Sequence, residues 1–335
     1  MGLFDFLTGN SEDPALQAER ERRRAATVQN LEAGGLPLPA IERLQEQASR
    51  QNTPGHVFTS DLSASELALL GNAGYEPLGQ VMGVSVYHVG WQFGIFNGPS
   101  WWMSGSSQEL TVLTQAFYNA RHLAIGRLIQ EAQLLGATGV VGVRLKHKQG
   151  DWGGELTEFS AIGTAIREHD HTGHAQQPFA SALSGQEFWT LRQAGYRPVG
   201  LAVGNCTYYQ IPTWSTQNAV NGGWFGGGSW QNMELPDYTQ AVYTARELAM
   251  ERMEKEALSF GGQGVIGASI DVDATPRHVE VNKRTRVDMI YHFTALGTSI
   301  VPLPPAHLPP RLSIGTTISL RPGGMVSKSL TSKDS

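Results

Sequence analysis

Phe58-Thr59-Ser60-Asp61-Leu62-Ser63 returns 121 positions later as Phe179-Ala180-Ser181-Ala182-Leu183-Ser184, and this duplication decides the fold. The same shift places Gly74-Tyr75-Glu76-Pro77-Leu78-Gly79 on Gly195-Tyr196-Arg197-Pro198-Val199-Gly200. Both stretches keep their glycines, their tyrosine and their turn proline. The chain therefore contains two copies of one structural unit.

The shift between the copies grows along the chain, and its growth locates two insertions. Residues 114–121 match residues 239–246 at a shift of 125, and residues 159–166 match residues 293–300 at a shift of 134. The second copy thus has four extra residues before a long helix and nine more near its end. We expect both insertions in loops, where a longer connection costs little free energy.

Each copy predicts the same order of elements. A short helix opens with a capping-box spacing, Ser63 with Glu66 and Ser184 with Glu187. A long amphipathic helix follows the first strand, at about 109–135 and 237–260, and a glycine ends each one. The predicted strands are 80–89, 139–147 and 155–166 in the first copy, and 201–211, 264–272 and 284–300 in the second. We therefore expect an α+β fold with two tandem β-α-β-β two-layer domains, each a three-stranded antiparallel sheet on one helix.

The rest of the chain surrounds and joins these copies. An N-terminal helical arm, with helices at 14–33 and near 40–48, precedes them, and a Pro-rich tail follows. The expected divisions are 1–55 for the arm, 56–167 for the first repeat, 168–177 for a His-rich joint, 178–301 for the second repeat and 302–335 for the tail.

Composition excludes several classes of function. The net charge of −5 gives no overall attraction to nucleic acid. A single cysteine, Cys206, rules out a disulfide framework and a thiolate-rich metal site within one chain. No run of about eighteen apolar residues is present to span a bilayer. We expect a cytoplasmic protein, with contact to the inner face of the membrane as an alternative.

Four stretches of the first copy resemble the YbjQ family of small bacterial proteins, which is labelled "putative heavy-metal-binding". They are Gly83-Val84-Ser85-Val86, Ala120-Arg121-His122-Leu123-Ala124, the segment 131–143 and the closing strand 159–166. The second copy keeps Ala245-Arg246-Glu247-Leu248-Ala249 but has a weaker match after its long helix. The resemblance implies a dodecin-like subunit and a ring-shaped homo-oligomer, which is pentameric in the family. It implies no established activity.

A metal site is one candidate for chemistry, and it lies in the joint. His169, Asp170, His171 and His174 place three imidazoles and a carboxylate within six residues. These ligand types suit a divalent transition metal such as zinc, nickel or copper. The alternative is a solvated polar linker without support for its ligands.

Aromatic residues in glycine-rich loops are a second candidate. Six of the eight tryptophans fall in the loops before the long helices. Such side chains can anchor contacts between subunits, stack a flat ligand, or cover a sheet within one subunit. The candidate interface or ligand-stacking residues are Trp91, Trp101, Trp102, Trp214, Trp224, Phe225 and Trp230.

The two ends of the chain suggest contacts with other surfaces. An apolar cluster of Leu3, Phe4, Phe6 and Leu7 precedes an arginine-rich helix, which is typical of a peripheral membrane anchor. Acidic residues of the arm dilute that charge. The proline-rich tail favours an extended strap that docks on a protein partner, or a disordered segment.

Comparison of the copies argues against a repeated catalytic or metal site. Neither a histidine nor a cysteine occupies the same position in both: His88 corresponds to Tyr209, His122 to Glu247, and Cys206 to Ser85. No nucleophile, base and orienting group can be assembled from the sequence. We therefore expect a non-enzymatic, ring-forming scaffold protein, with a metal- or ligand-binding protein and a membrane-associated oligomer as alternatives.

Overall fold

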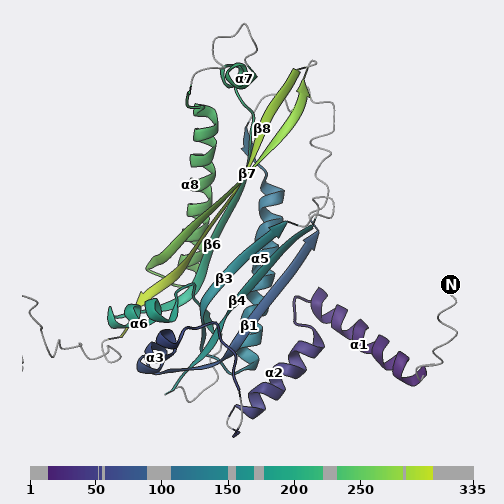
Figure 1. Ribbon diagram of the computed structural model, residues 1–335, viewed down its shortest axis with the longest axis vertical. Coiled ribbons are helices and arrows are strands. Elements are labelled where there is room, and N and C mark those ends of the chain that lie inside the picture. Colours follow the sequence, from purple (N-terminus) through teal and green to yellow (C-terminus); the bar gives the residue numbers. More distant parts are fainter. Residues whose placement is uncertain are drawn as a thin grey trace, which may run out of the picture.

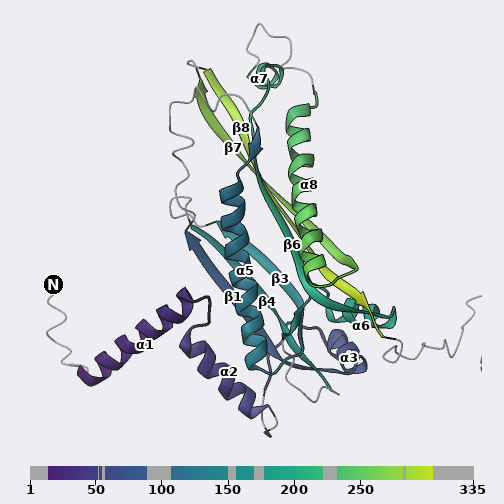
Figure 2. The ribbon, with the colours of Figure 1, turned by 180° about the vertical axis from the view of Figure 1, so that it is seen from behind.

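The computed structural model describes residues 14–51, 53–54, 57–88, 107–149, 156–169, 177–221, 232–281 and 284–304. Figure 1 shows two sheets with helix α8 along one side of the molecule and helices α1 and α2 on the opposite side. The view from behind in Figure 2 keeps the same order. The molecule is therefore a row of two units, with an additional helical arm at one end.

Both repeats contain the expected β-α-β-β core, which confirms the α+β fold class. The first repeat contains α3 (Ala64–Asn72), β1 (Tyr75–His88), β2 (Gln108–Glu109), α5 (Thr111–Leu134), β3 (Gly139–Gln149) and β4 (Leu156–Glu168). The second contains β5 (Phe179–Ala180), α6 (Gly185–Gln193), β6 (Tyr196–Gln210), α7 (Trp214–Asn221), α8 (Pro236–Ser259), β7 (Gly264–Val281) and β8 (Arg284–Pro302).

The predicted helix ends are confirmed in both repeats. The Ser63 and Ser184 side chains each accept a hydrogen bond from the backbone N–H of the glutamate three residues later, and that glutamate bonds back to the serine. After the long helices, Gly136 and Gly261 both have a φ of 73°, the left-handed conformation that glycine adopts without strain.

The sheets differ from the expected three strands, because each takes a fourth strand from the other repeat. The strand orders are β1-β4-β3-β5 and β2-β6-β8-β7. Strand β5, at the start of the second repeat, pairs in parallel with β3, and β2 of the first repeat pairs antiparallel with β6. Strands of two residues have no periodicity that a sequence could show. The repeats are therefore interlocked.

The nine-residue insertion was expected in a loop, and this expectation was wrong. Strand β7 continues to Val281, nine residues past the predicted end, and pairs with β8 along its whole length, up to Val281 opposite Arg284. The inserted residues lengthen the β7–β8 hairpin, which projects beyond the rest of the second sheet in Figure 1.

Helix α5 lies between the two sheets, and α8 covers the far face of the second sheet. Leu201 and Val203 of β6 share a core cluster with Leu128 of α5. Ala202, on the opposite face of β6, packs on Met253 of α8. A Cβ added to Gly204 would lie 1.8 Å from a backbone oxygen of α8, so this helix rests directly on the strand.

The first sheet has one covered face and one open face. Helix α5 approaches β1 as closely as α8 approaches β6, since a Cβ on Gly83 would lie 1.9 Å from the Ala124 carbonyl oxygen. On the opposite face, Met82 and Val86 are 47% and 62% exposed, and Arg144, Lys146 and Lys148 are exposed beside them.

The arm forms the two expected helices, α1 (Pro14–Glu32) and α2 (Leu38–Arg50), joined through Gly34 with a φ of 82°. Leu44 of α2 is completely buried in the core cluster that contains Leu128. Arg127 of α5 fastens the arm, because its guanidinium donates to the carbonyl oxygens of Leu31 and Gly35.

Candidate functional site

The interface between the repeats contains a buried arginine, and we take this interface as the candidate site. Arg121 of α5 is 1% exposed, and it donates to Asn205 Oδ1 at 2.6 Å and to the Val203 carbonyl oxygen at 3.2 Å. Glu256 of α8 lies 3.8 Å from the same guanidinium. A side chain of the first repeat thus bonds to a side chain and a backbone carbonyl of β6 in the second repeat.

Burial controls the electrostatics of Arg121. Desolvation lowers its pKa to about 10, although the Glu256 carboxylate opposes the shift. The guanidinium carbon also lies 4.6 Å from the centre of the Tyr118 ring, a cation–π contact. The arginine remains charged at neutral pH, and the pairing with Glu256 compensates for its burial.

Two carboxylate–arginine pairs occupy equivalent places beside β1 and β6. Glu131 accepts the Met82 N–H at 2.8 Å, and Glu256 accepts the Val203 N–H at 2.7 Å. Arg127 and Arg252 donate to the carbonyl oxygens two residues further on, at 2.6 and 2.8 Å. The shift of 125 residues that aligns the long helices also aligns Glu131 with Glu256 and Arg127 with Arg252.

A cluster of aromatic rings from both repeats, here called the ring cluster, lies beside Arg121. The Phe117 centroid is 5.3 Å from that of His147 and 5.2 Å from that of His292. Burial lowers the pKa of His292 to about 4 and also lowers the pKa of His147. Both rings contact threonine hydroxyls, His147 at Thr157 and His292 at Thr207. These imidazoles are therefore neutral packing groups at physiological pH.

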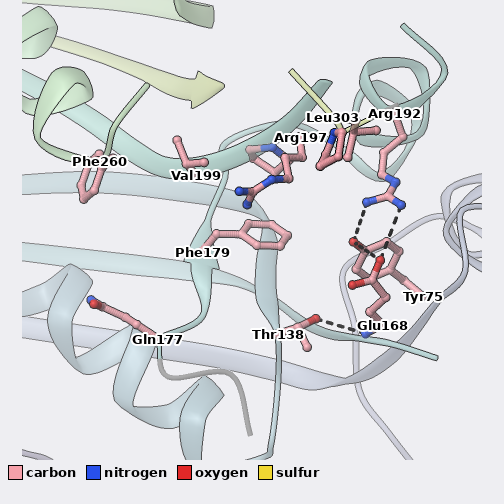
Figure 3. A pocket seen from close by; sticks show the side chains of 12 residues that line it. Tyr75, Thr138, Glu168, Gln177, Phe179, Arg192, Arg197, Val199, Phe260 and Leu303 are labelled. Carbon is pink, nitrogen blue, oxygen red and sulfur yellow. Dashed lines mark hydrogen bonds and ion pairs between the residues drawn. The ribbon is translucent and has the colours of Figure 1, made fainter. Parts of the chain in front are cut away.

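A cleft of about 550 Å³ opens between the repeats, and Figure 3 shows its side chains. Arg192 of α6 donates to the Tyr75 hydroxyl at 2.9 Å and lies 3.5 Å from Glu168. The Tyr75 hydroxyl in turn donates to Glu168 at 3.2 Å. Burial raises the pKa of Tyr75, so its hydroxyl stays protonated. The three groups satisfy one another and fasten the second repeat to the first.

Cys206 is buried on β6 rather than placed for chemistry. Its side chain is 1% exposed, and burial raises the pKa of its thiol to about 12. A buried thiol that is held in its neutral form is a poor nucleophile at neutral pH. Across the described residues, no three His, Cys, Asp or Glu side chains gather closely enough to hold a metal ion.

Most of the sequence-predicted site residues lie outside the described residues. His169 is exposed at the end of β4, and its N–H donates to the Gly74 carbonyl oxygen. Trp214 begins α7 and is 63% exposed. The candidates outside the described part are Asp170, His171, His174, Trp91, Trp101, Trp102, Trp224, Phe225, Trp230, Leu3, Phe4, Phe6 and Leu7. Their metal, stacking and membrane roles stay predictions.

Among the helices of the described residues, none combines the length and the apolar composition that crossing a bilayer requires.

Comparison with known proteins gives two matches. The family model described as "Putative heavy-metal-binding" matches residues 68–169 and 228–301. A protein of Mycobacterium tuberculosis named encapsulin nanocompartment protein Rv1762c is 45% identical over 214 residues, which cover 63% of this chain and 76% of that protein. No solved structure matches the chain. The two regions cover more than half of the chain: the first contains the whole core of the first repeat, and the second contains α8, β7 and most of β8. The chain therefore belongs to the YbjQ family.

Proposed function

We propose that this chain is a non-catalytic subunit of a large homo-oligomeric assembly, of the nanocompartment type. One observation carries the proposal: the 45% identity to a protein named for an encapsulin nanocompartment, over 76% of that protein's length. Identity of this extent supports a shared mode of assembly.

The chemistry of the described residues supports a structural role. The polar groups between the repeats bond one another: Arg121 with Asn205, and Arg192 with Tyr75. Cys206 is a buried thiol. The open face of the first sheet adds apolar surface that a second molecule would cover, because Met82 and Val86 remain exposed there.

The test is the mass and shape of the full-length chain, purified without a tag at micromolar concentration. We expect closed particles by electron microscopy and a native mass many times the 36.4 kDa of one chain. A chain that remains monomeric at every concentration would overturn the proposal.

A second candidate function is binding of a divalent transition metal at the joint. The description of the matched family favours it. His169 supports it in part, because this first residue of the set stands exposed at the surface. Elemental analysis of protein purified without chelator tests this function. Protein that still contains no metal after exposure to zinc, nickel and copper would exclude it.

A further inference from the structure

We propose that the second repeat of one chain binds the first repeat of another copy through the contacts that join the two repeats within one chain. The inference rests on the proposed self-association and names its surfaces. Its basis is a difference in exposure. Residues that are buried where the repeats meet have counterparts, at the same places of the other repeat, that remain exposed.

The sides of β1 and β6 that face away from the long helix of their own repeat show this difference most clearly. Val203 and Thr207 of β6 are 0% and 1% exposed, because α5 and its preceding segment cover them. Their counterparts on β1 are Met82 and Val86, which are 47% and 62% exposed. A second copy that placed its α8 here would bury both side chains.

The short helices give the second contact. Within the chain, Phe188 of α6 is fully buried and packs edge-to-face on Tyr75, with ring centroids 5.1 Å apart. The counterpart of Phe188 is Leu67 of α3, which is 39% exposed, and the counterpart of Tyr75 is Tyr196, which is also 39% exposed. Leu67 of one copy can therefore pack on Tyr196 of another.

Edge pairing gives the third contact. The segment after β5 bonds to β3, since the Ser181 N–H donates to the Val140 carbonyl oxygen. Within each repeat, Ser60 and Ser181 take the same position, because their hydroxyls meet Thr164 and Thr298 at 3.0 and 3.3 Å. The segment 58–60 therefore lies on the first repeat as the segment 179–181 lies on the second, and Phe58 is 38% exposed. Its partner in another copy would be the start of β7.

The long helices give the fourth contact. Arg246 and Tyr243 of α8 hold the places of Arg121 and Tyr118 on α5, but the Arg246 side chain is 43% exposed and Tyr243 is 58% exposed. The Arg121 guanidinium reaches Glu256 within the chain. By the same geometry, Arg246 would approach Glu131 of the next copy, whose side chain is 7% exposed, accepts the Met82 N–H and lies beside Arg43.

The arm shapes the surface that would receive α8. A groove of about 730 Å³ lies between α2 and the segment 57–59, and its walls include Arg43, Gln47 and Arg50. Glu46 also lines the groove and pairs with Arg50 at 2.6 Å, so Arg43 is the cation of this groove that lies nearest to Glu131.

Helix α8 exposes carboxylates, of which Glu247 pairs with Arg246 and Glu251 with Lys255. Glu247 and Glu251 have side chains that are 70% and 58% exposed, and Glu254 follows on the same exposed side. Glu247 replaces His122, so the contact would bring a second carboxylate near Glu131. Arg43, 3.5 Å from Glu131, and Arg246 would supply the two positive charges that balance these carboxylates.

A contact of this kind is heterologous, because the second repeat of each chain meets the first repeat of the next. Heterologous contacts close into rings when the rotation allows and otherwise continue as filaments. Since every chain adds two units, a closed ring of whole chains contains an even number of units.

The test is a disulfide between two copies. Within the chain, a Cβ at Gly185 would lie 2.8 Å from the Glu66 Cβ, so these positions nearly touch. The counterpart of Glu66 is Glu187, and the counterpart of Gly185 is Ala64. The proposal places Glu187 of one copy beside Ala64 of the next. The variant Ala64→Cys/Glu187→Cys should form a ladder of linked chains on a non-reducing gel after mild oxidation. Each single variant should stop at dimers.

The matched control is Glu66→Cys/Gly185→Cys, whose disulfide should form within one chain and give no ladder. The native mass of the unoxidised Ala64→Cys/Glu187→Cys variant distinguishes a failure of the proposed interface from a failure of self-association. Assembled protein without a ladder would overturn the interface and leave self-association standing, whereas monomeric protein of native stability would overturn both.

A charge on the open sheet face gives an independent test. Val86→Glu should weaken association at least tenfold, while Val28→Glu, at a position on α1 that is 53% exposed, should leave it unchanged. Equal association of the two variants would contradict the proposed contact. Circular dichroism of the isolated chains checks that both remain folded.

Discussion

Arg121 and Arg246 occupy the same position of the two repeats, within the matching segments 114–121 and 239–246, yet their surroundings are opposite. Arg121 is 1% exposed and bonds to the neighbouring repeat. Arg246 has a side chain that is 43% exposed and pairs with Glu247, the next residue in the chain. The repeated sequence determines the core of each unit. The neighbour of each unit determines which of its surfaces are buried.

Removal of the two charges should therefore have different effects. Arg121→Met removes the positive charge beside the buried Glu256 carboxylate and the hydrogen bonds to Asn205 and Val203, and should lower the free energy of unfolding by about 3–5 kcal/mol. Arg246→Met should change it by less than about 0.5 kcal/mol. Urea unfolding of the dissociated chains measures both values, and equal losses would contradict the comparison.

The ring cluster predicts a pH effect whose largest contribution comes from His292 of the second repeat. His292 occupies the place of Glu158 in the first repeat, and burial lowers its pKa from 6.5 to about 4. The folded chain therefore binds fewer protons than the unfolded chain between these values, so stability is lost as the pH falls from about 6.5 to 4. The expected loss is about 3 kcal/mol.

The control for this effect is His292→Gln, which removes the titrating group. Its free energy of unfolding should fall less steeply between pH 6.5 and 4.5 than that of the unaltered chain. An unchanged slope would show that the carboxylates alone cause the acid sensitivity.

Where the repeats have the same surroundings, equivalent substitutions should have the same effect. Gly83→Ala and Gly204→Ala each place a Cβ within 2 Å of a helix carbonyl oxygen, 1.9 Å for Gly83 and 1.8 Å for Gly204. Each helix must move away, and we expect losses of about 1–3 kcal/mol in both variants. Thermal unfolding would contradict this symmetry if only one of them were destabilised.

The smallest effect is expected at the joint, which neither repeat shares. If the joint binds metal, His171→Asn/His174→Asn should abolish stoichiometric zinc binding and change the free energy of unfolding by less than about 0.5 kcal/mol. Elemental analysis and unfolding of the same samples give both values. Zinc retained in full by the variant would place the metal elsewhere.

The sequence predicted the parts of the fold that depend on local signals. The capping boxes at Ser63 and Ser184 and the glycine ends at Gly136 and Gly261 all depend on a few adjacent residues, and all are present. The three long strands of each sheet follow from β-branched composition and are also present.

The interface between the repeats could not be predicted, because it depends on packing between distant segments. Strands β2 and β5 are too short to show a pattern. Arg121 and Arg127 are charged residues of a helix, which composition assigns to a solvated face, yet both are buried. The sequence shows only that Arg246 and Arg252 occupy the same positions in the second repeat. This correspondence does not distinguish a buried arginine from an exposed one.

Amide hydrogen exchange of the full-length chain, followed by mass spectrometry, measures directly whether the exposed counterparts are covered. In the assembled protein, the segment 58–60 should exchange as slowly as its buried equivalent 179–181. After dilution to single chains, only the segment 58–60 should become fast. Fast exchange of the segment 58–60 in an intact assembly would contradict the head-to-tail contact.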